Sequence, residues 1–360
     1  MENRITFLDW TRCIACLMVM LVHACEYYYL NDDGFHLATA DDAFWVSAID
    51  SACRASVPLF VITSSYLLFP LSRPTCDFFR RRLTRVLLPG VVWMCVYCAA
   101  FGGWERLPFN FPDAGGHLWF VPMIIGVYLL MPLLSPWAEK VSKRELQWWI
   151  ALWFLTTTFP FVRKLWEVLF GAPSFGAIPY LWGECPWNDY GTFYYVSGFF
   201  GYLLLGLWFR RYLTSLGRPV TLVIAVTLLI IGYLTSALVF YLRMPLSPSP
   251  ITLPYAFAVD LEMSWMFCST GVAFTVIGWF MLFSLIRNDG RLYRRVIRPA
   301  AKVSYGTYLM HMLILTPVVN ILARHFPTPA AIVLTAALTF ISATLVSAAI
   351  SKIPYLSRLV

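Results

Sequence analysis

The stretch DWTRCIACLMVMLVHACE, residues 9–26, decides how the rest of the chain is interpreted. It is apolar and long enough to cross a bilayer as a helix, yet it holds an arginine, a histidine and an acidic residue at each end. A charged side chain at the centre of a membrane costs roughly 2.5–3.5 kcal/mol on insertion scales. Ionisable residues in such a segment therefore indicate a functional site inside a membrane protein.

The composition of the whole chain also indicates a membrane protein. Of its 360 residues, 59% are hydrophobic, 17% are aromatic and only 13% are charged, whereas soluble domains have about 25% charged residues. The first apolar segment is too long for a signal peptide, contains Arg12 and His23, and lacks a small-residue cleavage site. We therefore expect it to remain in the protein.

Ten windows are apolar enough to form membrane-spanning helices, which need about 17–25 such residues. With their connections they occupy nearly the whole chain, and no internal repeat is evident. The sequence therefore predicts an all-α polytopic membrane protein with about ten transmembrane helices in one domain over residues 1–360. The windows are 5–28, 44–69, 86–101, 118–134, 146–161, 192–209, 220–241, 263–286, 300–322 and 330–350.

The net charge of +8 does not indicate nucleic acid binding, because the basic residues follow a topological pattern. With the N-terminus in the cytoplasm, the inward loops hold most of the Lys and Arg residues and the outward loops are rich in Asp and Glu. Ten spans place both termini in the cytoplasm. We expect membrane lipid as a partner and no nucleic acid.

Arg12 and His23 lie on one stripe of the first predicted helix. Their eleven-residue separation turns an α-helix through about 1100°, which is three turns plus about 20°. The two side chains stand roughly 16 Å apart along the axis. Asp9 and Glu26 are each three residues from one of them, close enough for contact. We expect a polar wall in which Asp9 neutralises Arg12 and Glu26 orients the His23 ring.

The cysteines and histidines do not indicate a disulfide framework or a metal site. Most of the nine cysteines fall in or beside the apolar windows. Cys13 with Cys16 and Cys95 with Cys98 have C-x-x-C spacing, but each pair is in a predicted helix without a second pair nearby. We interpret them as small packing residues. The five histidines are scattered without metal-ligand spacing.

Three segments together resemble a known family. Asp9, Arg12 and His23, in the pattern L-D-x-x-R followed by ten residues and a histidine, resemble the first-helix motif of the acyltransferase 3 family of membrane proteins. RASVPLFVITSSYLLF, from Arg54, resembles the family's R-x-x-V-P-L-F-F-x-x-S-G-Y segment. FFRRRLTRVLLP, ending at Pro89, resembles the family's basic R-x-x-R turn closed by a proline.

Further segments extend the resemblance over most of the chain. HLWFVPMIIGVYLLMPLL from His117, TFYYVSGFFGYLLLG from Thr192 and SYGTYLMHMLIL from Ser304 also fit the family. Ser65 departs from it, because the family usually has glycine there, which puts close helix packing at that position in question. The chain is similar to bacterial inner-membrane members that O-acetylate surface polysaccharides or their lipid-linked precursors, such as the enterobacterial common antigen.

The resemblance implies that the donor substrate is acyl-CoA, usually acetyl-CoA, supplied from the cytoplasm. Phosphate groups need cations, and the planar fork of arginine suits them. Arg82 and Arg85, at i and i+3, are expected on one face of an entering helix. Arg12, paired with Asp9, is expected to hold the pyrophosphate or guide the pantetheine arm. Family matching adds Ser64, Ser304 and His311 to the donor-binding residues.

His23 is the candidate general base, because a neutral imidazole can take the proton of an acceptor hydroxyl as it attacks the thioester. Glu26 would fix the ring's tautomer, as carboxylates do in acyl-transfer triads. Arg54 is a candidate oxyanion partner. In an alternative two-step reaction, His23 or Ser64 carries the acyl group transiently.

The acceptor is expected on the outer side, as a surface glycan or lipid-linked glycan. His117 and Trp119 lie at the outer mouth of the fourth window, and Tyr194 lies at the start of the sixth. The outer loop 163–190 is rich in aromatic residues, including Trp182. These rings would stack on sugars or form a membrane-interface belt, and both interpretations stay open.

Two other function classes are alternatives. A glycan transporter or flippase would also be all-helical, but it should show repeated halves with broken helices. A glycosyltransferase using a lipid-linked sugar would place an acidic pair in its first outer loop, where Asp32 and Asp33 occur. That loop is short and acidic throughout, so a solvated turn is the simpler interpretation. A homo-oligomer is compatible with the sequence.

Overall fold

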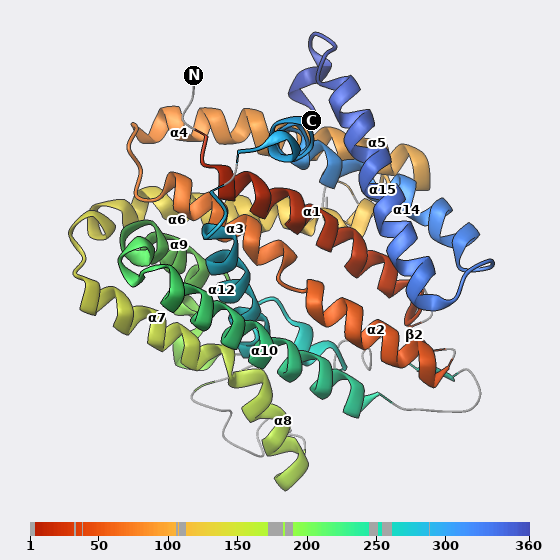
Figure 1. Ribbon diagram of the computed structural model, residues 1–360, viewed down its shortest axis with the longest axis horizontal. Coiled ribbons are helices and arrows are strands. Elements are labelled where there is room, and N and C mark those ends of the chain that lie inside the picture. The colour runs from red at the N-terminus through yellow and green to blue at the C-terminus, as the bar shows by residue number, and fades with distance from the viewer. Residues whose placement is uncertain are drawn as a thin grey trace. The chain divides into compact units, whose positions relative to one another are not determined.

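The computed structural model describes residues 4–31, 34–37, 39–105, 107, 113–171, 183, 190–244, 251–253, 261–287 and 289–360. Figure 1 shows that helices dominate this part of the chain. The predicted Trp182 lies outside the described residues.

The all-α polytopic prediction is confirmed. Eight helical segments of the described chain are long and apolar enough to cross a membrane. They coincide with eight of the ten predicted windows. Their bounds are Thr6–Glu26, Ala40–Leu68, Thr75–Phe101, Gly116–Lys140, Arg218–Arg243, Glu262–Ser284, Ser304–Leu322 and Thr328–Ile350.

The fifth and sixth windows differ from the prediction of continuous spans. Window 146–161 is divided between α7 (Lys143–Thr157) and α8 (Phe159–Phe170). Pro160 in the first turn of α8 has no N–H to continue the ladder of α7, so a new helix begins there. Window 192–209 is divided between the 3₁₀ helix η4 (Gly191–Val196) and α9 (Phe200–Tyr212).

The chain forms two compact units, each assembled from separated segments. Unit 1 comprises Met1–Tyr28, Leu67–Glu139 and Phe283–Val360, and unit 2 comprises Tyr29–Tyr66 and Lys140–Leu282. The single domain expected over residues 1–360 stays a prediction.

Unit 1 is built around α1, α14 and α15, which lie side by side (Figure 1). Gly306 lets the chain end approach α14, since a Cβ there would lie 2.4 Å from Cβ of Val360. The indole of Trp93 donates to the carbonyl of Leu359 at 2.9 Å. The elements of unit 1 are α1 (Thr6–Glu26), α4 (Thr75–Arg82), η1 (Leu83–Leu87), α5 (Leu88–Phe101), η2 (Asp113–Trp119), α6 (Phe120–Lys140), η7 (Tyr293–Ile297), α13 (Arg298–Lys302), α14 (Ser304–Leu322), α15 (Thr328–Ile350) and η8 (Leu356–Arg358).

Two of these elements, η1 and η7, are π-helical turns. Each is followed within two residues by a proline, Pro89 after η1 and Pro299 after η7. Such wide turns are rare and often occur at functional sites.

Unit 2 packs α2 against α10 and α7 against α9. α7 begins with an N-cap residue, Ser142, whose hydroxyl accepts from the backbone N–H of Glu145 at 3.1 Å. Besides α7, α8, η4 and α9, its helices are α2 (Ala40–Cys53), α3 (Ser56–Leu68), η5 (Leu213–Leu216), α10 (Arg218–Arg243), η6 (Glu262–Trp265) and α12 (Thr270–Ser284).

Small residues bring the helices of unit 2 close together, as is common in membrane proteins. A Cβ on Gly232 of α10 would lie 2.4 Å from the carbonyl oxygen of Gly271 in α12. Ser65 of α3 donates to the carbonyl of Leu203 at 2.6 Å, and a Cβ on Gly206 would lie 2.4 Å from its side chain. Close packing at Ser65 is therefore preserved, because the glycine is on the facing helix α9.

A small antiparallel sheet in unit 2 is an addition to the predicted fold. It has the order β1–β2–β3, formed by Leu30–Asn31, Gly34–Leu37 and Ile251–Leu253. Leu30 pairs with Phe35, and Phe35 pairs with Leu253. The sheet joins the segment after α1 to the segment before η6.

Candidate active site

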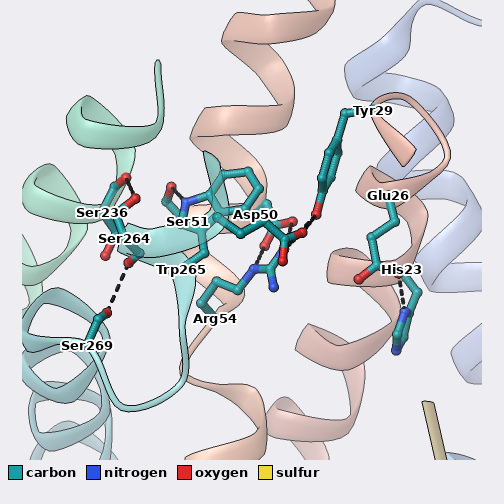
Figure 2. Close-up of polar contacts among 11 residues, drawn as sticks. His23, Glu26, Tyr29, Asp50, Ser51, Arg54, Ser236, Ser264, Trp265 and Ser269 are labelled. Carbon is teal, nitrogen blue, oxygen red and sulfur yellow. Dashed lines mark hydrogen bonds and ion pairs between the residues drawn. The ribbon is translucent and has the colours of Figure 1, made fainter. Parts of the chain in front are cut away.

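His23 and Glu26 form a hydrogen-bonded dyad near the end of α1. Nδ1 of His23 lies 2.6 Å from Oε2 of Glu26, and Figure 2 shows the two side chains pointing toward each other. The spacing of three residues places both on one helical face. Because a carboxylate only accepts, the proton of the neutral imidazole is on Nδ1, and Nε2 is the basic nitrogen. The predicted pairing of Glu26 with His23 is thus present.

Two more imidazoles lie beside His23 in unit 1. The ring centroid of His311, on α14, is 5.2 Å from that of His23. The ring of His117, in η2, is 6.3 Å from His23 and 4.8 Å from His311. Both His117 and His311 are buried. Three segments that are distant in sequence therefore contribute to one cluster, which we call the histidine cluster.

The position of His117 is fixed by several hydrogen bonds to α14. Its Nε2 lies 3.3 Å from the carbonyl of Leu309, and the hydroxyl of Tyr308 donates to its backbone carbonyl. The hydroxyl of Tyr97 donates to the same Leu309 carbonyl at 3.1 Å. Since a carbonyl only accepts, Nε2 of His117 carries the proton. Among the residues that the structure describes, no group of His, Cys, Asp and Glu side chains is arranged to hold a metal ion.

A second polar cluster lies at the start of α1. The buried Asp9 accepts from Arg4 at 3.1 and 2.8 Å and from the hydroxyl of Tyr293 at 2.9 Å. Arg12 lies farther away, with Nη1 3.9 Å from Asp9. Burial and the hydrogen bond to Asp9 raise the pKa of the Tyr293 hydroxyl. Asp9 is therefore shared between two arginines, with Arg4 as the closer one.

Arg82 belongs to the same neighbourhood. Arg12 lies within electrostatic range of both Arg4 and Arg82. The Arg82 guanidinium carbon is 6.0 Å from the ring of Phe78 and 5.8 Å from that of Tyr128. Its Nε is buried and has no hydrogen-bond partner among the described residues. We call Arg4, Asp9, Arg12 and Arg82 the arginine cluster; its three guanidinium groups and one carboxylate have a net positive charge.

Arg85 does not share the face of Arg82, contrary to the simple helical expectation. Arg85 lies inside the π-helical turn η1 and is exposed, whereas Arg82 at the end of α4 is half-buried. A π turn has more residues per turn than an α-helix, so the i, i+3 pair no longer lines up.

Arg54 occupies the centre of a buried cluster in unit 2 (Figure 2). Its Nε and Nη2 donate to the two oxygens of Asp50 at 2.5 and 2.9 Å, and Nη2 also donates to Tyr29 at 2.8 Å. Tyr29 donates to Glu262 at 2.6 Å. The guanidinium carbon lies 4.6 Å from the Trp265 ring centroid. The oxyanion role of Arg54 stays a prediction, since these donors already bind Asp50 and Tyr29.

The remaining predicted residues are dispersed. Ser304 is buried at the start of α14, and its hydroxyl donates to the carbonyl of Ala301 at 3.2 Å. Ser64 is half-buried in α3 of unit 2, and Trp119 is half-buried at the end of η2 in unit 1. Tyr194 is exposed in η4 of unit 2.

Sequence reasoning missed Arg4 and Tyr293 in the arginine cluster and Asp50, Tyr29 and Glu262 around Arg54. Asp50 was detectable, because it precedes Arg54 by four residues on a helix, a spacing that favours ion pairs. Arg4 lies before the first turn of α1, so helical spacing does not relate it to Asp9. Tyr293 and Glu262 are distant in sequence from their partners and carry no local signal.

The helices and the ionisable clusters define a multi-pass membrane protein with polar chemistry inside its helical units. A family model described as an acyltransferase domain matches residues 5–351, so the chain belongs to the acyltransferase 3 family. The resemblance found in the motifs is thereby confirmed. No curated protein and no solved structure matches the chain significantly.

Family membership makes the chain a membrane acyltransferase. It favours this class over the transporter and the glycosyltransferase considered from the sequence.

Proposed function

We propose that this protein is an O-acyltransferase of the bacterial inner membrane, which transfers an acetyl group from cytoplasmic acetyl-CoA to a hydroxyl of an extracytoplasmic glycan or lipid-linked glycan. The observation that carries the proposal is the 2.6 Å dyad of His23 and Glu26, on the same helix as Arg12.

In this reaction His23 is the general base. Nε2 takes the proton of the acceptor hydroxyl while the hydroxyl oxygen attacks the thioester carbonyl, and the carbon–sulfur bond then breaks. The products are the O-acetyl ester and the CoA thiol, which receives the proton. A positioned base typically accelerates such a step by about 10²–10⁴-fold. Glu26 holds the proton on Nδ1 and stabilises the imidazolium as it forms.

The arginine cluster supports binding of the CoA phosphates. The single negative charge of Asp9 does not balance the positive charges of both Arg12 and Arg82. In addition, Nε of Arg82 has no hydrogen-bond partner among the described residues. Phosphate oxygens accept strong, charge-assisted hydrogen bonds from guanidinium groups. Arg85 and the other exposed arginines of α4 and η1 add to the local positive potential.

The distance between the two clusters fits a CoA thioester. Arg12 and His23 are both on α1, which is a continuous helix from Thr6 to Glu26. Eleven residues at 1.5 Å per residue separate them by roughly 16 Å along the axis, about the reach of a pantetheine arm. A donor held by its phosphates at Arg12 would therefore present its thioester near His23.

The proposal is tested by mass spectrometry of surface glycans from bacterial cells that produce the wild-type protein, the His23→Ala variant, or no protein. We expect acetylated glycan only with the wild type. His325→Ala is the matched control and should keep activity, because His325 is exposed in the turn after α14. Purified protein with radiolabelled acetyl-CoA should transfer label to the same glycan. Label transfer by folded His23→Ala protein at the wild-type rate would overturn the role of His23.

A further inference from the structure

Nε2 of His311 is a buried polar atom that has no hydrogen-bond partner among the described residues. The side chain is 0% exposed. Its other ring nitrogen, Nδ1, lies 2.5 Å from the carbonyl oxygen of Tyr308, three residues earlier on α14. Buried polar atoms in native proteins are nearly always paired, so each exception needs an explanation, and binding of a ligand is one.

The hydrogen bond at Nδ1 determines what Nε2 can bind. The Tyr308 carbonyl only accepts, so the proton of the neutral ring is on Nδ1. Nε2 therefore presents a lone pair and can accept a hydrogen bond but not donate one. The missing partner must be an O–H or N–H group.

The location of His311 connects this missing partner to the reaction. Its ring centroid is 5.2 Å from that of His23 and 4.8 Å from that of His117. The Nε2–H group of His117 donates to the carbonyl of Leu309, at 3.3 Å, and therefore does not donate to His311. A group that donates to His311 would therefore lie beside the hydroxyl that donates to His23.

We propose that His311 binds a second hydroxyl of the acceptor, on the carbon next to the one that becomes acetylated. This inference rests on the proposed function and specifies its substrate class: the acceptor is a vicinal diol, as a pyranose ring provides. One hydroxyl donates to Nε2 of His23 and reacts, and its neighbour donates to Nε2 of His311. No bond is made or broken at His311, which is a specificity-determining residue.

The pantetheine arm of the donor also has amide N–H groups, but the position of His311 favours the acceptor. His117, the nearest other imidazole, precedes α6 at the end that the charge pattern places outside. The glycan arrives from that side. Neighbouring hydroxyls on a sugar ring are also close together, which suits two imidazoles whose ring centroids are 5.2 Å apart.

Binding of this kind selects among acceptors. A site that hydrogen-bonds a substrate hydroxyl strongly rejects analogues without it, because its own buried polar group is then left unpaired. An isolated hydroxyl would leave Nε2 of His311 without a partner. The enzyme should therefore acetylate hydroxyls that have a free neighbour.

The first test locates the acetyl group by NMR on the surface glycan of producing cells. We expect an adjacent ring carbon to carry a free hydroxyl in the unmodified glycan. An acetylated hydroxyl whose neighbouring carbons are all substituted or lack hydroxyls would overturn the inference. This test needs no variant, so it does not depend on how a substitution folds.

The second test uses purified full-length protein with that glycan and acetyl-CoA. In His311→Gln, the side-chain carbonyl oxygen is an acceptor near the position of Nε2. In His311→Asn, the shorter side chain keeps an N–H donor near the position of Nδ1 but has no acceptor near the position of Nε2. We expect His311→Asn to lower kcat/KM for the glycan by about tenfold to a hundredfold, with KM for acetyl-CoA unchanged. His311→Gln should retain most of the wild-type value.

Two results would overturn the inference. Either both variants behave alike toward the glycan, or His311→Asn raises KM for acetyl-CoA and leaves the glycan parameters unchanged, which would assign His311 to the pantetheine arm. Failure of the proposed function is distinct from both, because the wild type itself would then transfer no acetyl group.

Discussion

Glu26 Oε2 lies 2.6 Å from Nδ1 of His23, one helical turn away on the same face of α1 (Figure 2). The carboxylate thereby selects the tautomer in which Nε2 is basic. Glu26→Gln keeps the size of the side chain but removes the charge that stabilises an imidazolium. We expect kcat to fall by roughly 10²–10⁴-fold, with KM for acetyl-CoA unchanged. Steady-state kinetics with labelled acetyl-CoA measure this effect.

The control for this substitution is Glu139→Gln, at an exposed position on α6 of the same unit. It should leave kcat within about twofold of the wild type, since surface substitutions away from structural features have small effects. Equal rates for Glu26→Gln and Glu139→Gln would remove Glu26 from the mechanism.

Arg82→Ala should weaken CoA binding more than it slows the reaction at saturating donor. Hydrogen bonds to charged groups contribute about 1.5–3 kcal/mol, so the Kd for CoA should rise by about tenfold to a hundredfold. Isothermal titration of CoA into detergent-solubilised protein measures it. Arg81→Ala, at an exposed neighbouring position, is the control and should change Kd only slightly. An unchanged Kd for Arg82→Ala would contradict the phosphate role.

Arg54→Met should destabilise the fold, because it leaves the carboxylate of Asp50, which is 0% exposed, without its guanidinium partner. Loss of one member of a buried ion pair costs about 3–5 kcal/mol. The double variant Asp50→Leu with Arg54→Met should recover much of this loss, since an apolar replacement of the whole pair leaves no buried charge. Thermal unfolding in detergent compares the three proteins.

The single variant Arg54→Met and the double variant Asp50→Leu with Arg54→Met also test the predicted oxyanion role of Arg54. If Arg54 only maintains structure, the double variant should recover activity together with stability. A stable double variant without activity would instead assign Arg54 to the reaction.

Gly206→Ala should be destabilising by about 1–3 kcal/mol, because its Cβ would lie 2.4 Å from the side chain of Ser65. Ser65→Gly removes this clash but also the 2.6 Å bond to the Leu203 carbonyl. The double variant Gly206→Ala with Ser65→Gly should therefore lose less stability than the sum of the losses measured for the two single variants. Gly126→Ala, which meets open space on α6, is the control for thermal unfolding and should not destabilise.

Much of the fold was predictable because membrane helices carry a strong local signal. Runs of apolar residues located eight of the ten windows, and helical periodicity placed Arg12 and His23 on one stripe of α1. The break between α7 and α8 was detectable at Pro160, but hydropathy alone does not register it. The short sheet was not predictable, since strands of two to four residues have no usable periodicity.

The candidate site was predictable only where its contacts are local. Glu26 and His23 are one turn apart, so their pairing follows from spacing. The approach of His117 and His311 to His23 depends on how η2 and α14 pack against α1, which no local pattern determines. Family resemblance selected these histidines but not their hydrogen bonds. The bond from Tyr293 to Asp9 is of the same long-range kind.

The π-helical turn η1 gives one continuous helical segment two independent surfaces. The extra residue in such a turn rotates everything beyond it by about 100° relative to an unbroken α-helix. Arg82 can thus stay beside the aromatic rings of Phe78 and Tyr128 while Arg85 meets solvent. Deleting Val86, which follows Arg85 in the turn, would restore an ordinary helix in which Arg82 and Arg85, at i and i+3, lie on the same side. The local helical pitch, as much as the number of arginines, therefore sets how many positive charges point toward the interior of this unit.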